Sequence, residues 1–230
     1  MIMYNILLFI PICIFTLKLN YILNLYLNKN VLYLNHTSTK RRYITKNIVK
    51  SIILFIITII TVKSKYDIYR YNYWNNFLIH TIGSFYVSND VLGLILIKDL
   101  SRSTKFHHII STILLFINYT IDYTKNTSDM SIEIGKLLVV YASFSSYSFI
   151  VNFTLGYRFL VDKNSKIINK LKKISFYIYL ISCGMNWGLQ IYFLYIFNNI
   201  SVIVKFFYLL IICPIVNDDI VLMTWLNKND

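Results

Sequence analysis

Seven apolar stretches alternate with polar, mostly basic segments along the chain, and this pattern constrains the fold more than any other feature. The stretches comprise residues 6–17, 48–62, 77–97, 107–121, 137–155, 174–197 and 202–216. A helix needs about 20 residues to cross a bilayer, its backbone amides must be satisfied internally, and no stretch shows the two-residue alternation of a barrel strand. We therefore predict an all-α fold: a multi-pass transmembrane helical bundle of about seven helices. Six is the alternative, because several stretches are shorter than a full span.

The composition excludes several other classes of protein. Hydrophobic residues make up 57% of the chain and charged residues 14%, whereas soluble domains are about 45–50% apolar and about 25% charged. The three cysteines lie singly within apolar stretches, with no C-x-x-C spacing. This arrangement favours neither a disulfide framework nor a zinc site.

The formal net charge of +13 is distributed between the apolar stretches. Segments 28–46, 98–105 and 157–173 hold five, three and six Lys and Arg residues, whereas the three alternate segments hold three, one and none. The positive-inside rule then predicts that the basic segments and the C-terminus are cytoplasmic. There is no continuous basic helix with an aromatic platform, so we expect contacts with anionic lipid and no nucleic-acid partner. No basic residue precedes the first stretch, so we also expect it to be retained as a helix.

A few ionisable residues lie within or beside the apolar stretches, where burial in lipid is costly and each such group is a functional candidate. They are His80, Asp90, His107, His108, Asp218 and Asp219. A histidine can act as a general base, and Asp90 could fix its tautomer. Consecutive helical residues lie about 100° apart, so the two rings cannot present one face. We expect Asp90 and at least one of the two imidazoles to face the bundle interior, while the other imidazole supports it or lies at the membrane surface. The alternative is that both rings, like that of His80, lie among lipid headgroups. Four histidines are too few for a membrane di-iron site. The HH pair with Asp90 could hold a single metal ion, but we predict no metal site.

Two segments carry a family pattern. They are GSFYVSNDVL from Gly83 and KFHHIIS from Lys105, which give Y-x-x-x-D on one helix, a basic loop, and an HH pair opening the next helix. This pattern resembles the TLC domain, the membrane domain of translocating-chain-associating proteins, ceramide synthases and the ceroid-lipofuscinosis membrane protein. Tyr86, Asp90, His107 and His108 occupy the matching positions, which the family places in a central cavity. Weaker similarities surround Ser51 and Trp225. The resemblance implies an N-terminal transmembrane helix and basic loop over residues 1–45 and a TLC-like domain over 46–230.

The sequence departs from the ceramide synthases in one important motif. These enzymes have G-x-L-x-x-x-x-H-D-x-x-D after the HH pair. Gly135 and Leu137 match its start, but the H-D-x-x-D positions are residues 142–146, which read ASFSS. The Glu and S-T-P-F turn of the other TLC branch are missing too. The chain is therefore similar to a divergent TLC protein.

The resemblance implies two functions. The first is lipid homeostasis, by lipid sensing, transport or composition control, in the endoplasmic reticulum. The second is that of a ceramide-synthase-like acyltransferase, in which His107 or His108 removes a proton from a sphingoid base and Asp90 orients the imidazole. Lys98, Arg102 and Lys105 would then hold the phosphates of acyl-CoA. Whether the chain is an enzyme stays open, as does homo-oligomerisation, and we expect membrane lipids as partners and no resident cofactor. A channel or transporter is disfavoured because no broken-helix Gly/Pro pair or repeat occurs.

Overall fold

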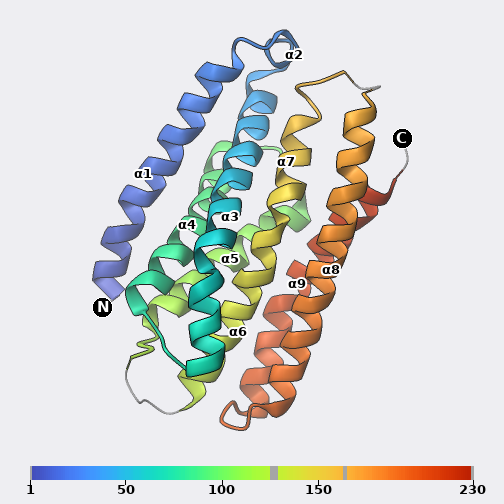
Figure 1. Ribbon diagram of the computed structural model, residues 1–230. Coiled ribbons are helices and arrows are strands. Elements are labelled where there is room, and N and C mark those ends of the chain that lie inside the picture. Colours follow the sequence, from blue (N-terminus) through green and yellow to red (C-terminus); the bar gives the residue numbers. More distant parts are fainter. Residues whose placement is uncertain (1, 125–128, 163–164, 229–230) are drawn as a thin grey trace.

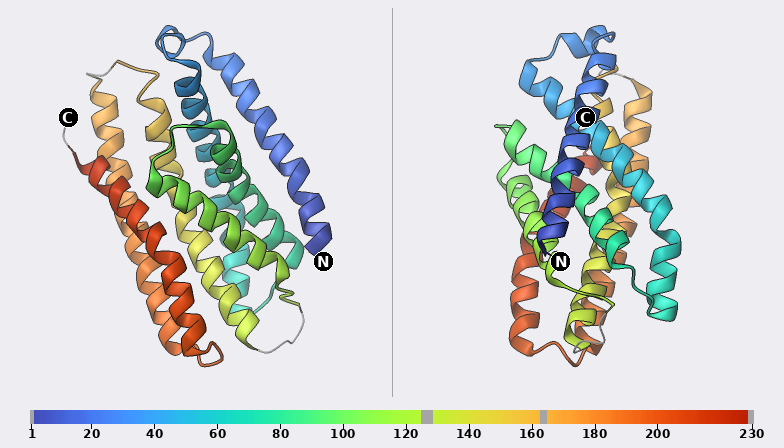
Figure 2. Two further views of the ribbon diagram at one scale, coloured as in Figure 1. Left: turned by 180° about the vertical axis from the view of Figure 1, so that it is seen from behind. Right: turned by 90° about the vertical axis from the view of Figure 1, so that its left-hand side faces the viewer.

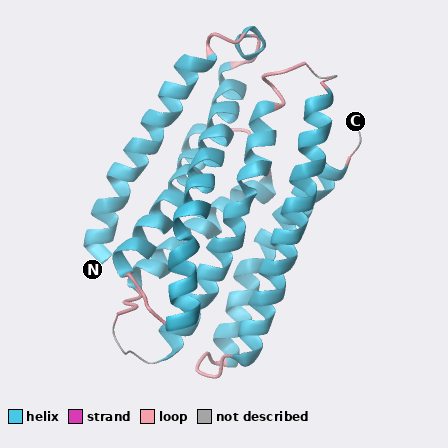
Figure 3. Ribbon diagram, in the orientation of Figure 1, coloured by secondary structure: helices cyan, strands magenta, loops and turns pink. Residues whose placement is uncertain are grey.

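In the computed structural model, which describes residues 2–124, 129–162 and 165–228, all regular secondary structure is helical (Figures 1 and 3). The elements are α1 (Ile2–Leu27), α2 (Val31–Leu34), α3 (Ser38–Tyr71), α4 (Asn76–Leu96), α5 (Arg102–Thr120), α6 (Asp129–Ser145), the 3₁₀ turn η1 (Ser146–Ser148), α7 (Phe149–Tyr157), α8 (Lys166–Ile196) and α9 (Val202–Asn227). Each of the seven predicted stretches lies in these helices, except that residues 97, 121 and 197 each lie one position beyond the end of a helix. The all-α prediction is therefore confirmed.

Four segments in the described part of the chain are long and apolar enough to cross a membrane. They are Met3–Leu27, Ser38–Ile68, Met130–Tyr157 and Val202–Asn227. Helices α4, α5 and α8 fall outside this group. They bury polar side chains such as Asn89 in α4, Asn118 in α5 and Gln190 in α8. The structure thus supports a multi-pass membrane protein with four candidate spans.

Several segments that we expected to be loops are helical. Helix α3 begins at Ser38, so most of the polar segment 28–46 is helix, and the expected domain division after residue 45 falls inside α3. Helix α8 begins at Lys166, within the basic segment 157–173. The side chains of Thr37 and Ser165 cap these helices. An apolar stretch marks only the apolar part of a helix. Lys and Arg are good helix formers, so with a capping residue the helix can continue beyond that part into water.

The fifth apolar stretch is broken in the middle. Helix α6 ends at Ser145, η1 follows, and α7 begins at Phe149. Serines compete for backbone hydrogen bonds within a helix, and here the Ser146 hydroxyl donates to the carbonyl of Ser143 at 2.7 Å. The break therefore falls within the serine-rich sequence SFSSYS.

The helices form an elongated bundle in which α3 packs on α7, α4 lies antiparallel beside α5, and α9 contacts both α5 and α8 (Figure 2). Helix α1 runs along the outside of the bundle and packs on α4 and α3. Only 11% of its most apolar 18-residue segment is buried. Figure 1 shows the α1–α2 connection, the end of α7 and the start of α8 together at the top, and the α3–α4 and α8–α9 connections at the bottom. The two most basic segments thus lie at the same end.

Candidate functional site

A polar cavity of about 550 Å³ lies between α3, α5, α7, α8 and α9 and the break at η1. Nine Lys, Arg, His and Asp side chains line it: Lys40, Lys46, Lys50, Asp99, His107, His108, Arg158, Asp218 and Asp219. A volume of 300–1,000 Å³ is typical of small-molecule sites. So many ionisable groups within an apolar bundle make this cavity the candidate functional site.

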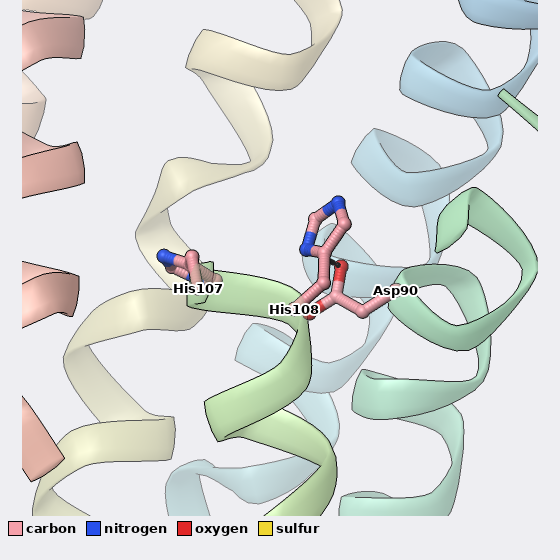
Figure 4. Close-up of side chains that lie close together, drawn as sticks. All are labelled: Asp90, His107 and His108. Carbon is pink, nitrogen blue, oxygen red and sulfur yellow. Dashed lines mark ion pairs between the residues drawn. The ribbon is translucent and has the colours of Figure 1, made fainter. Parts of the chain in front are cut away.

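Asp90 is fully buried and forms the centre of the first cluster. Its Oδ1 lies 2.5 Å from Nζ of Lys50. The same oxygen lies 3.1 Å from Nδ1 of His108 (Figure 4). Lys50 comes from α3, Asp90 from α4 and His108 from α5. The carboxylate therefore links three helices, and it compensates the buried ammonium group of Lys50.

His108 has a polar neighbour at each ring nitrogen. Nζ of Lys46 lies 2.9 Å from its Nε2, opposite the Nδ1 that faces Asp90. An ammonium group can only donate, so Nε2 accepts and the ring proton belongs on Nδ1, facing the carboxylate. The hydrogen bond at Nε2 and the carboxylate near Nδ1 thus favour one tautomer of His108.

His107 belongs to a second cluster. Its Nδ1 lies 3.3 Å from Oδ2 of Asp218 in α9. Figure 4 shows the two imidazoles pointing in different directions, and their ring planes are perpendicular. We expect at least one of the two rings to face the bundle interior, and in the structure both do, because α5 contacts α4 on one side and α9 on another. The side chains of His107 and His108 are 12% and 4% exposed.

Asp219, the next residue of α9, faces a different set of groups. It accepts hydrogen bonds from the Tyr179 hydroxyl at 2.5 Å and from the Trp187 Nε1 at 3.3 Å. Both aromatic side chains come from α8. The adjacent carboxylates of α9 therefore contact two different helices. Asp218 contacts α5, and Asp219 contacts α8.

Two site residues, Lys46 and Lys50, were not predicted from the sequence. We took Lys46 as the end of a polar segment, although it is buried within α3. Lys50 lies inside the second apolar stretch. A charged residue at such a position is a functional candidate, so the sequence does contain a signal for Lys50. The two residues are four apart and so share one face of the helix.

Other expected residues lie elsewhere. Lys98, Arg102 and Lys105 are exposed, and none of the three lines the cavity. Their phosphate-binding role stays a prediction. His80 is buried against Tyr119 and not in an interfacial layer of lipid headgroups, because α5 covers this face of α4.

The serines near the break line two different cavities. Of the serines in this region, Ser145 and Ser148 line the polar cavity, whereas Ser143 and Ser146 do not. Ser146 is instead buried and accepts a hydrogen bond from Thr58. Ser143 lines a smaller apolar cavity. The break at η1 changes the direction in which successive side chains point, so uniform helical spacing does not predict these positions.

Asp90, His107 and His108 place ligand-type atoms within 4.8 Å of one another. The neighbouring ammonium groups decide against a divalent cation at this point. Lys50 lies on the Asp90 carboxylate and Lys46 on the imidazole of His108. A metal would have to displace both groups and overcome their positive charge.

Comparisons with known proteins add no assignment. No family model matches the chain, and neither a curated protein nor a solved structure matches it.

Proposed function

We propose that this chain is a TLC-like multi-pass membrane protein of lipid homeostasis, which binds the polar part of a lipid in its cavity. Lipid sensing, transport or composition control would follow from that binding, in the endoplasmic reticulum. The observation that carries the proposal is the gathering of the TLC-like residues around this cavity. The cavity is lined by Tyr86, His107 and His108. The Asp90 carboxylate lies 3.1 Å from Nδ1 of His108.

A second cavity supports a lipid as the ligand. It measures about 110 Å³ and is lined mainly by apolar side chains of α3, α4, α5 and α6. Tyr86 lines both cavities, so one residue borders a polar space and an apolar space. A molecule with a polar head and an apolar chain matches this pair of environments.

An acyltransferase similar to ceramide synthase is the second candidate function. One observation favours it: His107 lies beside the Asp218 carboxylate, as a general base lies beside the group that orients it. Asp218 would supply from α9 a carboxylate that α6 lacks at the H-D-x-x-D positions. This candidate ranks second because α6 supplies no histidine there, and Lys98, Arg102 and Lys105 lie outside the cavity.

The first test is the lipid composition of cells that express the chain. We expect at least one lipid class to change in abundance with the native sequence and to return to baseline with His107→Ala/His108→Ala. His36→Ala is the matched control, because that ring contacts the Phe159 carbonyl and does not line the cavity. Unchanged lipids in all samples would remove the support for lipid homeostasis. Ceramide formation by purified protein from sphinganine and acyl-CoA, lost in the double variant, would promote the acyltransferase instead.

We propose seven membrane crossings, with six as the alternative and the C-terminus in the cytoplasm, because the segments richest in Lys and Arg lie at one end of the bundle. A glycosylation acceptor inserted after Lys166 is therefore expected to stay unmodified, and one inserted after Asn198 is expected to be glycosylated. The mass shift of each protein, with and without deglycosylation, measures the outcome. The reverse pattern would contradict this orientation.

A further inference from the structure

Two buried, oppositely charged side chains line the cavity, and neither has an ion-pair partner within the described residues. Lys46 and Asp219 are 7% and 6% exposed. The ion pairs in this part of the chain are Lys50–Asp90, His107–Asp218 and His108–Asp90. A buried charge is costly unless a partner compensates it, so both residues indicate a ligand.

Lys46 is held in a defined place. Its amine contacts Nε2 of His108 and lies against Gly93, where any side chain would collide with it. The nearby carboxylate of Asp90 is already bonded to Lys50. The Lys46 ammonium therefore faces the cavity without a carboxylate of its own. Lys40 lines the same cavity from the same helix.

Asp219 shows the converse arrangement. Both of its oxygens accept hydrogen bonds from neutral donors, Tyr179 and Trp187. These bonds fix the carboxylate but do not neutralise it. Asp219 belongs to α9 and Lys46 to α3, so the cavity has a cationic side and an anionic side.

We infer that the cavity binds a lipid whose headgroup carries both a phosphate and a primary amine. The phosphate would lie at Lys46 and Lys40, where ammonium groups donate to its oxygens. The amine would lie at Asp219, where its N–H groups reach a fixed carboxylate. Such a headgroup compensates both buried charges at once, whereas a neutral headgroup compensates neither. This inference rests on the proposed lipid-binding function and specifies the class of lipid.

Binding of soluble lipid probes to the purified full-length protein in detergent tests the inference. The probes are dioctanoyl phosphatidylethanolamine, dioctanoyl phosphatidic acid, dioctanoylglycerol and sphinganine. O-phosphoethanolamine, which has the headgroup chemistry without a lipid tail, separates a lipid from a free phosphate. We expect phosphatidylethanolamine to bind about tenfold more tightly than phosphatidic acid or sphinganine, each of which compensates one buried charge. We expect it to bind at least tenfold more tightly than dioctanoylglycerol, which compensates neither charge, and than O-phosphoethanolamine, which lacks the acyl chains.

Substitutions at Lys46 and Asp219 test which residue binds the phosphate and which binds the amine of the headgroup. Lys46→Met is expected to weaken phosphatidylethanolamine about tenfold, and Lys46→Arg to retain binding. Asp219→Asn is expected to reduce the affinity for phosphatidylethanolamine to that for phosphatidic acid. The matched controls are Lys205→Met and Glu133→Gln, because neither side chain lines the cavity. Gel filtration and circular dichroism of each variant establish that it is folded.

The outcomes separate this inference from the proposed function. Equal affinity for all dioctanoyl lipids, or an unchanged preference in folded Lys46→Met and Asp219→Asn, would overturn the headgroup assignment and leave lipid binding in place. Tighter binding of sphinganine than of phosphatidylethanolamine would also overturn it and would favour the acyltransferase. If no lipid bound, both the inference and the proposed function would fail.

Discussion

Replacement of Asp90 by alanine is expected to lower the free energy of unfolding by about 3–5 kcal/mol, because it leaves a buried ammonium group without its partner. Lys50 would lose a contact of 2.5 Å in the interior of the bundle. His108 would lose its neighbour at Nδ1. Reversible unfolding in mixed detergent micelles measures the change. The matched control is Asp99→Ala, an exposed carboxylate whose loss is expected to cost less than about 0.5 kcal/mol.

The second partner provides a stricter form of this experiment. Lys50→Met alone leaves Asp90 buried and uncompensated, so it should also destabilise the protein strongly. Lys50→Met combined with Asp90→Ala removes both charges and is expected to recover at least half of the loss, since apolar replacements of buried ion pairs are often neutral. A double variant whose loss equals the sum of the single losses would show that the two side chains do not act as a pair.

The sequence predicted the helices well because lipid-facing segments must be apolar over their length. It also indicated that Asp90 could reach a histidine. Helices α4 and α5 are joined by a short connection and so lie antiparallel, which places Asp90 near the start of α5. The observed distance of 3.1 Å between Asp90 and His108 agrees with that expectation, while a catalytic role for either residue stays a prediction.

The rest of the site depends on contacts between helices that are distant in the sequence. The second apolar stretch begins only after Lys46, so the hydropathy pattern assigned Lys46 to a loop, although α3 continues through it and it is buried. In the same way Asp218 and Asp219 looked like the end of a span, yet α9 is continuous from Val202 to Asn227. Their partners are on α5 and α8, and no local pattern in the sequence specifies that pairing.

The two imidazoles are expected to differ in reactivity. Diethyl pyrocarbonate acylates a free imidazole nitrogen, and Nε2 of His108 is engaged with Lys46 at 2.9 Å. His107 lines the cavity, and no hydrogen bond to its Nε2 occurs among the described residues. We therefore expect His107 in the folded protein to be modified about tenfold faster than His108, the difference that roughly one retained hydrogen bond produces. Tandem mass spectrometry of the peptide that contains both residues resolves the two rates.

Lys46→Met provides the decisive comparison, because it releases Nε2 of His108 without altering the His107–Asp218 contact. In this variant the His108 rate should rise towards that of His107, whereas the His107 rate should stay unchanged. Unfolding in denaturant should make the two rates equal in every protein, which separates the effect of the fold from the intrinsic chemistry of neighbouring histidines. If His108 reacted as fast as His107 in the folded native chain, Lys46 could not be holding its Nε2. The reactivity would then give no reason to assign His107, and not His108, as the imidazole that contacts a ligand in the cavity.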